Sequence, residues 1–306
     1  MIVTVCLNPS VDKTCEVESF QFGGTNRVIS AMLDAGGKGI NVALALKRLG
    51  QEAAATGFLY NKNADIFYDR LEKGNVICDF IVSDGSARTN IKLRDKKTGT
   101  ITEINEKGAA VDQSLINAVR DKCIELSKKC EYMVFTGSMP PGCPPDLYKT
   151  LINEIHCPAI LDADSTALKF GAEAAPFMIK PNIHEFEALL GQKLASPDEI
   201  VTCARTLIAK GVKYVLISMG SDGAMLVTKN DALFAPRIDV DVQSTVGAGD
   251  CMVAGFIHGI SMYSDIEAIF ASAVAAGTAG VMTSGTGLLE KETYEDLMNK
   301  VRIRKI

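Results

Sequence analysis

The stretch Ser244-Thr245-Val246-Gly247-Ala248-Gly249-Asp250 runs into the apolar residues 251–260, which predict a helix. Small residues at positions 247–249 let backbone N–H groups approach an anion closely, and the helix adds its positive N-terminal end. Asp250 is expected in the first turn, beside the same anion. This arrangement suits phosphoryl transfer, because the N–H groups hold negative charge while the carboxylate accepts a hydroxyl proton. The alternative is an ordinary Gly-rich turn capped by an aspartate.

Upstream of this motif, short apolar runs alternate with amphipathic stretches. Buried strands are predicted at residues 2–7, 53–59, 132–136, 159–162, 177–179 and 214–218. Helices are predicted at residues 40–49, 64–73, 112–129, 145–155, 183–190 and 197–210, and from residue 249 onward. The alternation predicts an α/β fold, with a mostly parallel central sheet and helices on both faces.

Two regions break this pattern. Residues 13–20, 27–33, 88–94 and 100–105 alternate polar and apolar side chains, as half-exposed strands do, and residues 95–99 predict a hairpin turn. We expect these strands, from about residues 13–35 and 85–108, to form a small sheet that projects from the main body. Neither a repeat nor a linker occurs, so residues 1–306 are expected to form a single domain.

Two further Gly-rich turns precede or follow regular elements. Residues 35–41 (Ala-Gly-Gly-Lys-Gly-Ile-Asn) open a predicted helix, and their glycines let the backbone reach a polyhydroxyl ligand, with Lys38 and Asn41 as donors. Residues 218–223 follow an apolar strand, as a phosphate- or ribose-contacting loop does. In open α/β sheets, ligands bind where strands end and helices begin.

Composition excludes several other classes. The net charge of −5 and the lack of long basic runs argue against a nucleic-acid partner. No apolar run approaches the ~18 residues of a membrane span, and residues 1–7 lack the basic flank of a signal peptide, so we expect a cytoplasmic protein without a membrane partner. The nine cysteines are scattered without a Cys-x-x-Cys pair, which indicates reduced core residues.

In order and spacing, these motifs resemble those of the ribokinase-like (PfkB) carbohydrate kinases along essentially the whole chain. The resemblance implies the ribokinase-like fold, with the small sheet as a lid and often as a dimer interface, so a homodimer through the lid strands is implied. It implies ATP and Mg²⁺ as cofactors. It also makes Asp250 the catalytic base and the backbone amides of Gly247, Ala248 and Gly249 the anion hole.

The same resemblance assigns the remaining ligand contacts. Those implied for the sugar are Asp12, Gly37, Lys38, Gly39 and Asn41. Those implied for ATP are Lys180, Asn182, Ser218, Gly220, Ser221, Asp222 and Gly223. Glu185, three residues after Asn182, is implied to help place Mg²⁺ indirectly.

Residues 4–12, 87–92 and 136–142 resemble the phosphosugar branch of the family, which contains the 1-phosphofructokinases and tagatose-6-phosphate kinases. In that branch Arg88, helped by Lys38 and Arg27, pairs with the phosphate already on the sugar; Asn90 and Ser138 lie in the same segments. Alternatively, Arg27 and Arg88 are solvated charges on lid strands.

The implied reaction is conversion of fructose 1-phosphate to fructose 1,6-bisphosphate by ATP. Tagatose-6-phosphate kinase is the alternative, because a ketohexofuranose carries a CH₂O group on either side of its ring. A third hypothesis is a catalytically silent sugar-phosphate sensor.

The sequence departs from the family pattern at one position that concerns cations. Ribokinase-type kinases usually carry Asp, a ligand of a monovalent cation, where this sequence has Ser244. We therefore do not expect strong K⁺ activation.

Overall fold

The computed structural model describes residues 1–283 and 287–306. Its main sheet has the strand order β15-β14-β13-β12-β11-β10-β9-β1-β4-β5, and β6 also pairs with β4. The strands are β1 (Ile2–Cys6), β4 (Ala53–Tyr60), β5 (Ile77–Cys78), β6 (Ile81–Ser83), β9 (Tyr132–Thr136), β10 (Ala159–Asp162), β11 (Met178–Ile179), β12 (Tyr214–Ser218), β13 (Ala224–Val227), β14 (Ala232–Ala235) and β15 (Arg304–Lys305). From β5 and β6 to β12 the pairing is parallel, while β13, β14 and β15 add an antiparallel edge.

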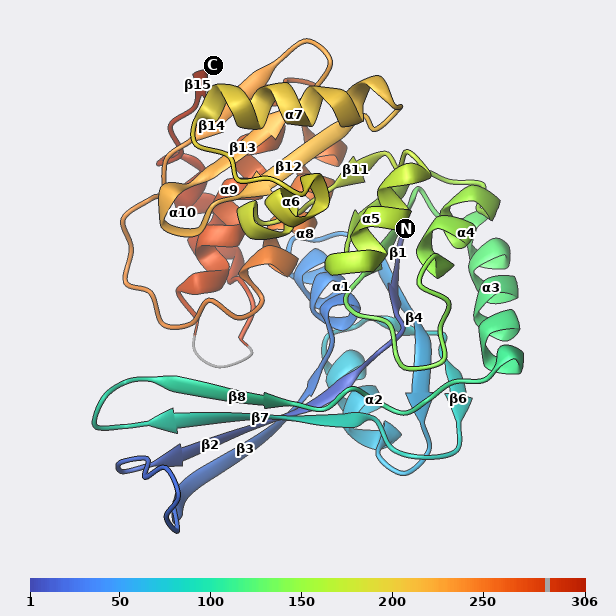
Figure 1. Ribbon diagram of the computed structural model, residues 1–306, viewed down its shortest axis with the longest axis vertical. Coiled ribbons are helices and arrows are strands. Elements are labelled where there is room, and N and C mark those ends of the chain that lie inside the picture. The colour runs from blue at the N-terminus through green and yellow to red at the C-terminus, as the bar shows by residue number, and fades with distance from the viewer. Residues whose placement is uncertain (284–286) are drawn as a thin grey trace.

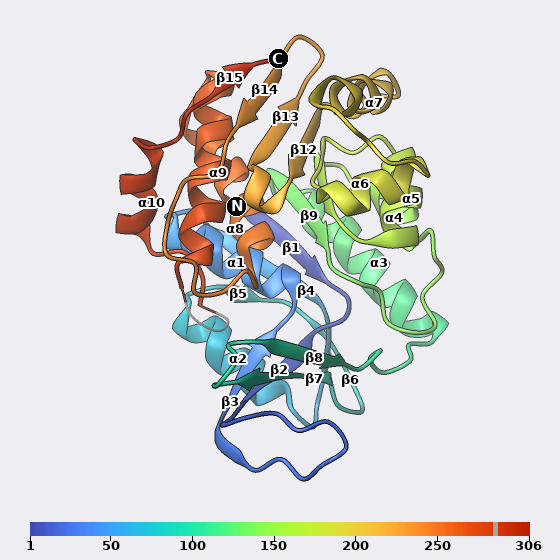
Figure 2. The ribbon, with the colours of Figure 1, turned by 60° about the vertical axis from the view of Figure 1, so that its left-hand side comes forward.

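Helices cover both faces of this sheet, as expected for parallel strands joined by crossovers. The helices are α1 (Lys38–Arg48), α2 (Ala64–Lys73), α3 (Gln113–Ser127), α4 (Leu147–Glu154), α5 (Ser165–Glu173), α6 (Ile183–Leu190), α7 (Pro197–Ala209), α8 (Ala248–Met262), α9 (Ile266–Val281) and α10 (Lys291–Met298). Figure 2 shows α1, α8, α9 and α10 on one face and α3 to α7 on the other. The predicted α/β class is confirmed.

Close packing of α8 on α9 fixes the start of α8. A Cβ atom on Gly255 would lie 2.4 Å from Ala276 Cβ and 2.5 Å from Ser272 O, so the two helices approach as closely as a bare backbone allows. Both helices are largely buried. The loop of residues 244–247 therefore leads directly into a helix that is held rigidly in place.

The small sheet has the strand order β3-β2-β7-β8 and projects below the main body (Figure 1). Its strands are β2 (Ser10–Val17), β3 (Val28–Gly36), β7 (Arg88–Asp95) and β8 (Ile101–Asn105). The small sheet predicted from alternating residues is thus present, although β2 begins earlier and β3 ends later than predicted. At the turn between β7 and β8, the Gly99 N–H donates to the Asp95 carbonyl.

Several elements were not predicted from the sequence: the short strands β5 and β6, the antiparallel strands β13 to β15, and the helix α5. In the part of the chain that the structure describes, no helix is long and apolar enough to cross a membrane.

Candidate active site

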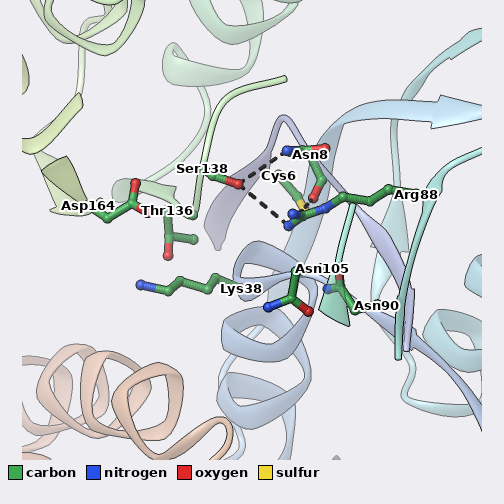
Figure 3. A pocket seen from close by; sticks show the side chains of 10 residues that line it. Cys6, Asn8, Lys38, Arg88, Asn90, Asn105, Thr136, Ser138 and Asp164 are labelled. Carbon is green, nitrogen blue, oxygen red and sulfur yellow. Dashed lines mark hydrogen bonds between the residues drawn. The ribbon is translucent and has the colours of Figure 1, made fainter. Parts of the chain in front are cut away.

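Two cavities lie between the main sheet and the small sheet. The larger has a volume of about 980 Å³ and is lined by the loops before α6, after β12 and before α8. The smaller has a volume of about 230 Å³ and lies at the ends of β1 and β9 (Figure 3). Lys38, Arg88, Asn90 and Asn105 line both cavities, which are therefore neighbouring parts of one site.

Asp250 lies in the first turn of α8, as predicted, and is 4% exposed. Gly247 caps this helix at φ +81°, a conformation that glycine adopts readily. Burial raises the pKa of Asp250 to about 6, although the nearby Lys38 ammonium and a 2.8 Å hydrogen bond from Asn41 Nδ2 act in the opposite direction. A carboxylate with a pKa of about 6 is suited to accept a proton near neutral pH.

A buried carboxylate holds two lysines beside this helix start. Asp162, at the end of β10, lies 3.2 Å from Lys180 Nζ and 3.4 Å from Lys38 Nζ. Burial opposes ionisation of Asp162, but the two ammonium groups outweigh it and hold the pKa below its ordinary value. The Asp162 charge in turn raises the pKa of Lys38. A Cβ atom on Gly249 would lie 3.2 Å from Lys180 Nζ, so a cationic group also borders the N-terminus of α8.

Asp12, the predicted sugar contact, is held by three donors. Lys92 Nζ lies 2.8 Å from Asp12 Oδ2, while Ser10 Oγ and Asn90 Nδ2 donate to Asp12 Oδ1 at 2.8 and 3.2 Å. Asp12 lies on β2 and Lys92 on β7, and both line the larger cavity. Gly36 lacks a side chain where a Cβ atom would come within 2.8 Å of the Asp12 carboxyl group, which explains the need for glycine there.

Arg88 enters the smaller cavity from the start of β7. Its guanidinium donates to the carbonyls of Glu106 and Asn8 at 3.0 and 3.3 Å and approaches Ser138 Oγ at 3.5 Å (Figure 3). These contacts fix the guanidinium in the cavity that Lys38 also lines. The arginine is therefore neither fully solvated nor free to rotate, and two cationic groups line this small space.

Three buried polar atoms of the described residues that line the cavities have no protein partner: Arg88 Nε, Asn90 Oδ1 and Asn41 Oδ1. Buried polar atoms are normally hydrogen-bonded, so each such atom calls for an explanation. One donor and two acceptors are the groups that a ligand with phosphate and hydroxyl groups would complete.

Asn182 and Glu185 form a capping box at the start of α6. The Asn182 side chain accepts from the Glu185 N–H at 2.9 Å, and Glu185 Oε2 accepts from the Asn182 N–H at 2.8 Å. Both residues line the larger cavity. Within residues 1–283 and 287–306, no group of three or more His, Cys, Asp or Glu side chains could hold a metal ion. An Mg²⁺ ion carried by phosphates and water needs only one or two such carboxylates, which fits Glu185.

Most of the sequence-predicted site residues meet at the two cavities. Lining the larger one are Asp12, Gly37, Lys38, Asn41, Arg88, Asn90, Lys180, Asn182, Glu185, Ser218, Gly220, Ser221, Asp222, Gly223, Gly247, Ala248, Gly249 and Asp250. Ser138 lines the smaller one. Arg27 is exposed in the loop between β2 and β3 and lines neither cavity. Gly39 also lines neither cavity. It is buried, and a Cβ atom there would lie 2.8 Å from Cys6 Cβ, so its backbone packs against β1.

Lys92 and Asp162 were missed by sequence reasoning. Asp162 was recognised only as the last residue of a predicted strand. Because ligands bind at the carboxyl ends of strands in α/β sheets, that position was the one sign of a role in the site. Lys92 was recognised only as part of residues 87–92, which resemble the phosphosugar branch, and no role was assigned to its side chain. Its partner Asp12 lies 80 residues away, and the sequence offers no sign of that pairing.

Residues 6–293 match the family model described as pfkB family carbohydrate kinase. The chain therefore belongs to the pfkB family of carbohydrate kinases. Its curated relatives include the 1-phosphofructokinase of Bacillus subtilis, 34% identical with 100% of both chains covered. Another is the 1-phosphofructokinase of Vibrio cholerae, 32% identical over 99% of this chain and 96% of the relative. Among solved structures, phosphofructokinase-2 from Escherichia coli in complex with potassium matches with a TM-score of 0.92 and 26% identity over 98% of each chain.

Proposed function

We propose that this kinase transfers the γ-phosphoryl group of ATP to fructose 1-phosphate, forming fructose 1,6-bisphosphate and ADP. The observation that carries the substrate assignment is the small cavity lined by Arg88 and Lys38, beside a cavity with Asp250 at its wall. Two cationic groups suit a phosphate already present on the sugar, and Arg88 Nε is a buried donor that such a phosphate would satisfy. The 1-phosphofructokinase relatives support the same substrate.

In the proposed mechanism Asp250 accepts the proton of the C6 hydroxyl. The hydroxyl oxygen then bonds to the γ-phosphorus, while the bond from that phosphorus to the bridging oxygen of ADP breaks. The backbone amides of Gly247, Ala248 and Gly249 stabilise negative charge on the transferred group, because the first turn of a helix leaves N–H groups without helical partners. Asp12 and Asn41 orient the sugar.

The remaining residues serve the nucleotide. Residues 218–223 contact ATP, together with Lys180 and Asn182, since all line the larger cavity. When bound, Mg²⁺ would neutralise the phosphate oxygens of ATP, and Glu185 would help to hold it. The small sheet closes over the sugar as a lid and excludes water, which limits hydrolysis of ATP.

An assay of ADP formation with fructose 1-phosphate, tagatose 6-phosphate, fructose 6-phosphate and fructose tests this proposal. We expect the highest kcat/KM with fructose 1-phosphate and a product identified as fructose 1,6-bisphosphate. A higher kcat/KM with tagatose 6-phosphate would favour the alternative kinase. The absence of turnover with every sugar, combined with measurable sugar-phosphate binding, would favour the silent sensor.

We also propose a homodimer formed through the small sheet. Exposed apolar side chains gather on β3, on β8 and in the loop between β2 and β3: Phe20, Phe22, Val28, Ile29, Met32, Leu33, Ile101 and Ile104. Phe22 is 97% exposed, and β3 and β8 are the edge strands of the sheet. Exposed apolar residues on open strand edges favour pairing with another chain.

Light scattering on the purified protein tests the dimer. The dimer predicts twice the 32.8 kDa chain mass, and Leu33→Lys should shift the population towards monomer. A wild-type protein that is monomeric at micromolar concentration would contradict the proposal.

All nine cysteines are free thiols, and this fits the ATP-containing, reducing cytoplasm that we propose as the location.

A further inference from the structure

Lys92 forms a buried ion pair that the proposed mechanism does not use. It is 8% exposed and its partner Asp12 is 7% exposed, with 2.8 Å between Nζ and Oδ2. Replacing a buried ion pair with apolar side chains is often neutral or stabilising, so stability alone does not explain a buried lysine here. Because both residues line the larger cavity, a role in ligand binding explains the pair better than a role in stability does.

The hydrogen bonds of Asp12 leave one direction open. A carboxylate offers about four acceptor positions. Ser10 and Asn90 take both positions on Oδ1, and Lys92 takes one on Oδ2. The fourth position remains for a sugar hydroxyl. Three donors on two strands therefore fix the carboxyl group, and Lys92 alone among the three contributes a full positive charge.

The positive charge of Lys92 matters because the proposed substrate is itself negatively charged. A sugar phosphate carries a charge of about −1.5 to −2 at pH 7. An unpaired Asp12 carboxylate in the same cavity would repel that charge through poorly screened surroundings. With Lys92 beside it, Asp12 keeps its acceptor oxygen but adds no net negative charge to the site. A sugar without a phosphate would gain much less from this cancellation.

We propose that Lys92 is a positioning residue that holds Asp12 and cancels its charge, so that the site selects sugars already carrying a phosphate. This inference rests on the proposed function and extends it to a second determinant of substrate class. Unlike Arg88, Lys92 acts on the charge of another residue, so the loss of Lys92 should be offset when the charge of Asp12 is removed as well.

The test is a double-mutant cycle with Lys92→Met, Asp12→Asn and the double variant. The readout is the ratio of kcat/KM for fructose 1-phosphate to kcat/KM for fructose. Lys92→Met should lower this ratio about 10–100-fold, with KM for ATP changed by less than about 2-fold. Asp12→Asn alone should raise the ratio, and Lys92→Met in that background should return it to within about 3-fold of wild type, because the double variant again has no net charge at this pair.

Two variants serve as controls. Lys92→Arg keeps the charge and should keep the ratio within about 3-fold of wild type. Lys96→Met removes a positive charge from the exposed hairpin of the same sheet and should leave the ratio unchanged. Should Lys92→Met fail to fold, Lys92→Gln takes its place in the cycle.

An unchanged ratio in Lys92→Met would overturn the proposal. A double variant whose ratio is as low as that of Lys92→Met alone would also overturn it, since Lys92 would then act on the phosphate independently of the Asp12 charge. The wild-type enzyme separates this inference from the proposed function. If it phosphorylates tagatose 6-phosphate and not fructose 1-phosphate, the proposed substrate is wrong, and the same variants compared on tagatose 6-phosphate and tagatose still test Lys92.

Discussion

The side-chain amide of Asn41 lies 2.8 Å from Oδ2 of Asp250, so a hydrogen bond joins α1 to the first turn of α8 across 209 positions of sequence. This bond fixes the carboxylate and favours its ionised form, whereas burial favours the protonated form. The pKa of about 6 results from these opposing effects together with the charges of neighbouring groups.

Asp250→Asn should lower kcat by ~10²–10⁴, the range for losing a general base, while sugar-phosphate and ATP binding change only several-fold. The substitution keeps the size of the side chain and removes its basicity. Single-turnover rates and ligand dissociation constants for the two proteins check this. Retention of more than about a tenth of wild-type kcat would show that another group is the base.

The activity should fall with acid as Asp250 becomes protonated. We expect kcat at saturating substrates to decline below pH 6, because the pKa of Asp250 is about 6 and only the ionised form accepts a proton. Saturation matters because the sugar phosphate itself titrates near this pH. Asn41→Ala removes a donor to the carboxylate and should move the decline to higher pH. A kcat that stays constant down to pH 5 would contradict the assignment.

Asp250 should also make the fold less stable as the pH rises from about 4 to about 6. Its folded-state pKa of about 6 exceeds the ordinary 3.8, so the folded state loses stability as pH rises between these values and stays destabilised above them. The difference of about two pKa units corresponds to at most about 3 kcal/mol. Asp250→Asn should therefore raise the free energy of unfolding by about 1–3 kcal/mol at pH 8, and by less at pH 5.

Urea unfolding at both pH values measures this effect. Asp296→Asn is a matched control, because Asp296 is exposed and its neutralisation should change stability little. A gain in Asp250→Asn that is equal at pH 5 and pH 8 would mean that ionisation of the carboxyl group is not the cause.

Replacing Na⁺ with K⁺ should change kcat by less than about 2-fold. Ser244 supplies a neutral hydroxyl where a carboxylate ligand is expected for strong cation binding, and its Oγ already accepts the Val246 N–H at 3.2 Å. Steady-state rates in matched chloride salts provide the measurement. A large K⁺-specific increase would mean that other groups form a cation site, and Ser244→Asp would then be expected to add little.

Local patterns predicted the parts of the site that are continuous in sequence. The turn at 244–250 and the helix after it were identifiable because small residues, a carboxylate and an apolar run follow one another. The four strands of the small sheet were identifiable from alternating side chains. Ala224–Val227 and Ala232–Ala235 were missed because two short apolar runs so close to the loop at 218–223 carry little periodicity of their own.

Contacts between distant segments could not be predicted. Asn41 was expected to bind the sugar, and its bond to Asp250 follows only from the packing of α1 beside α8. Likewise, Asp162 joins Lys38 and Lys180 only because β10 ends beside both residues. Such pairings depend on the order of strands in the sheet, which a single sequence does not specify.

The most direct test compares wild type with Arg88→Ala and Arg88→Lys on fructose 1-phosphate, fructose and ATP. If Arg88 binds the existing phosphate, Arg88→Ala should cost ~2–4 kcal/mol in kcat/KM for fructose 1-phosphate, the range for losing a partly desolvated charged contact. Values for fructose and KM for ATP should hardly change, and Arg88→Lys should recover part of the loss. Equal losses on fructose and fructose 1-phosphate would contradict the account, because Arg88 would then only support the small sheet.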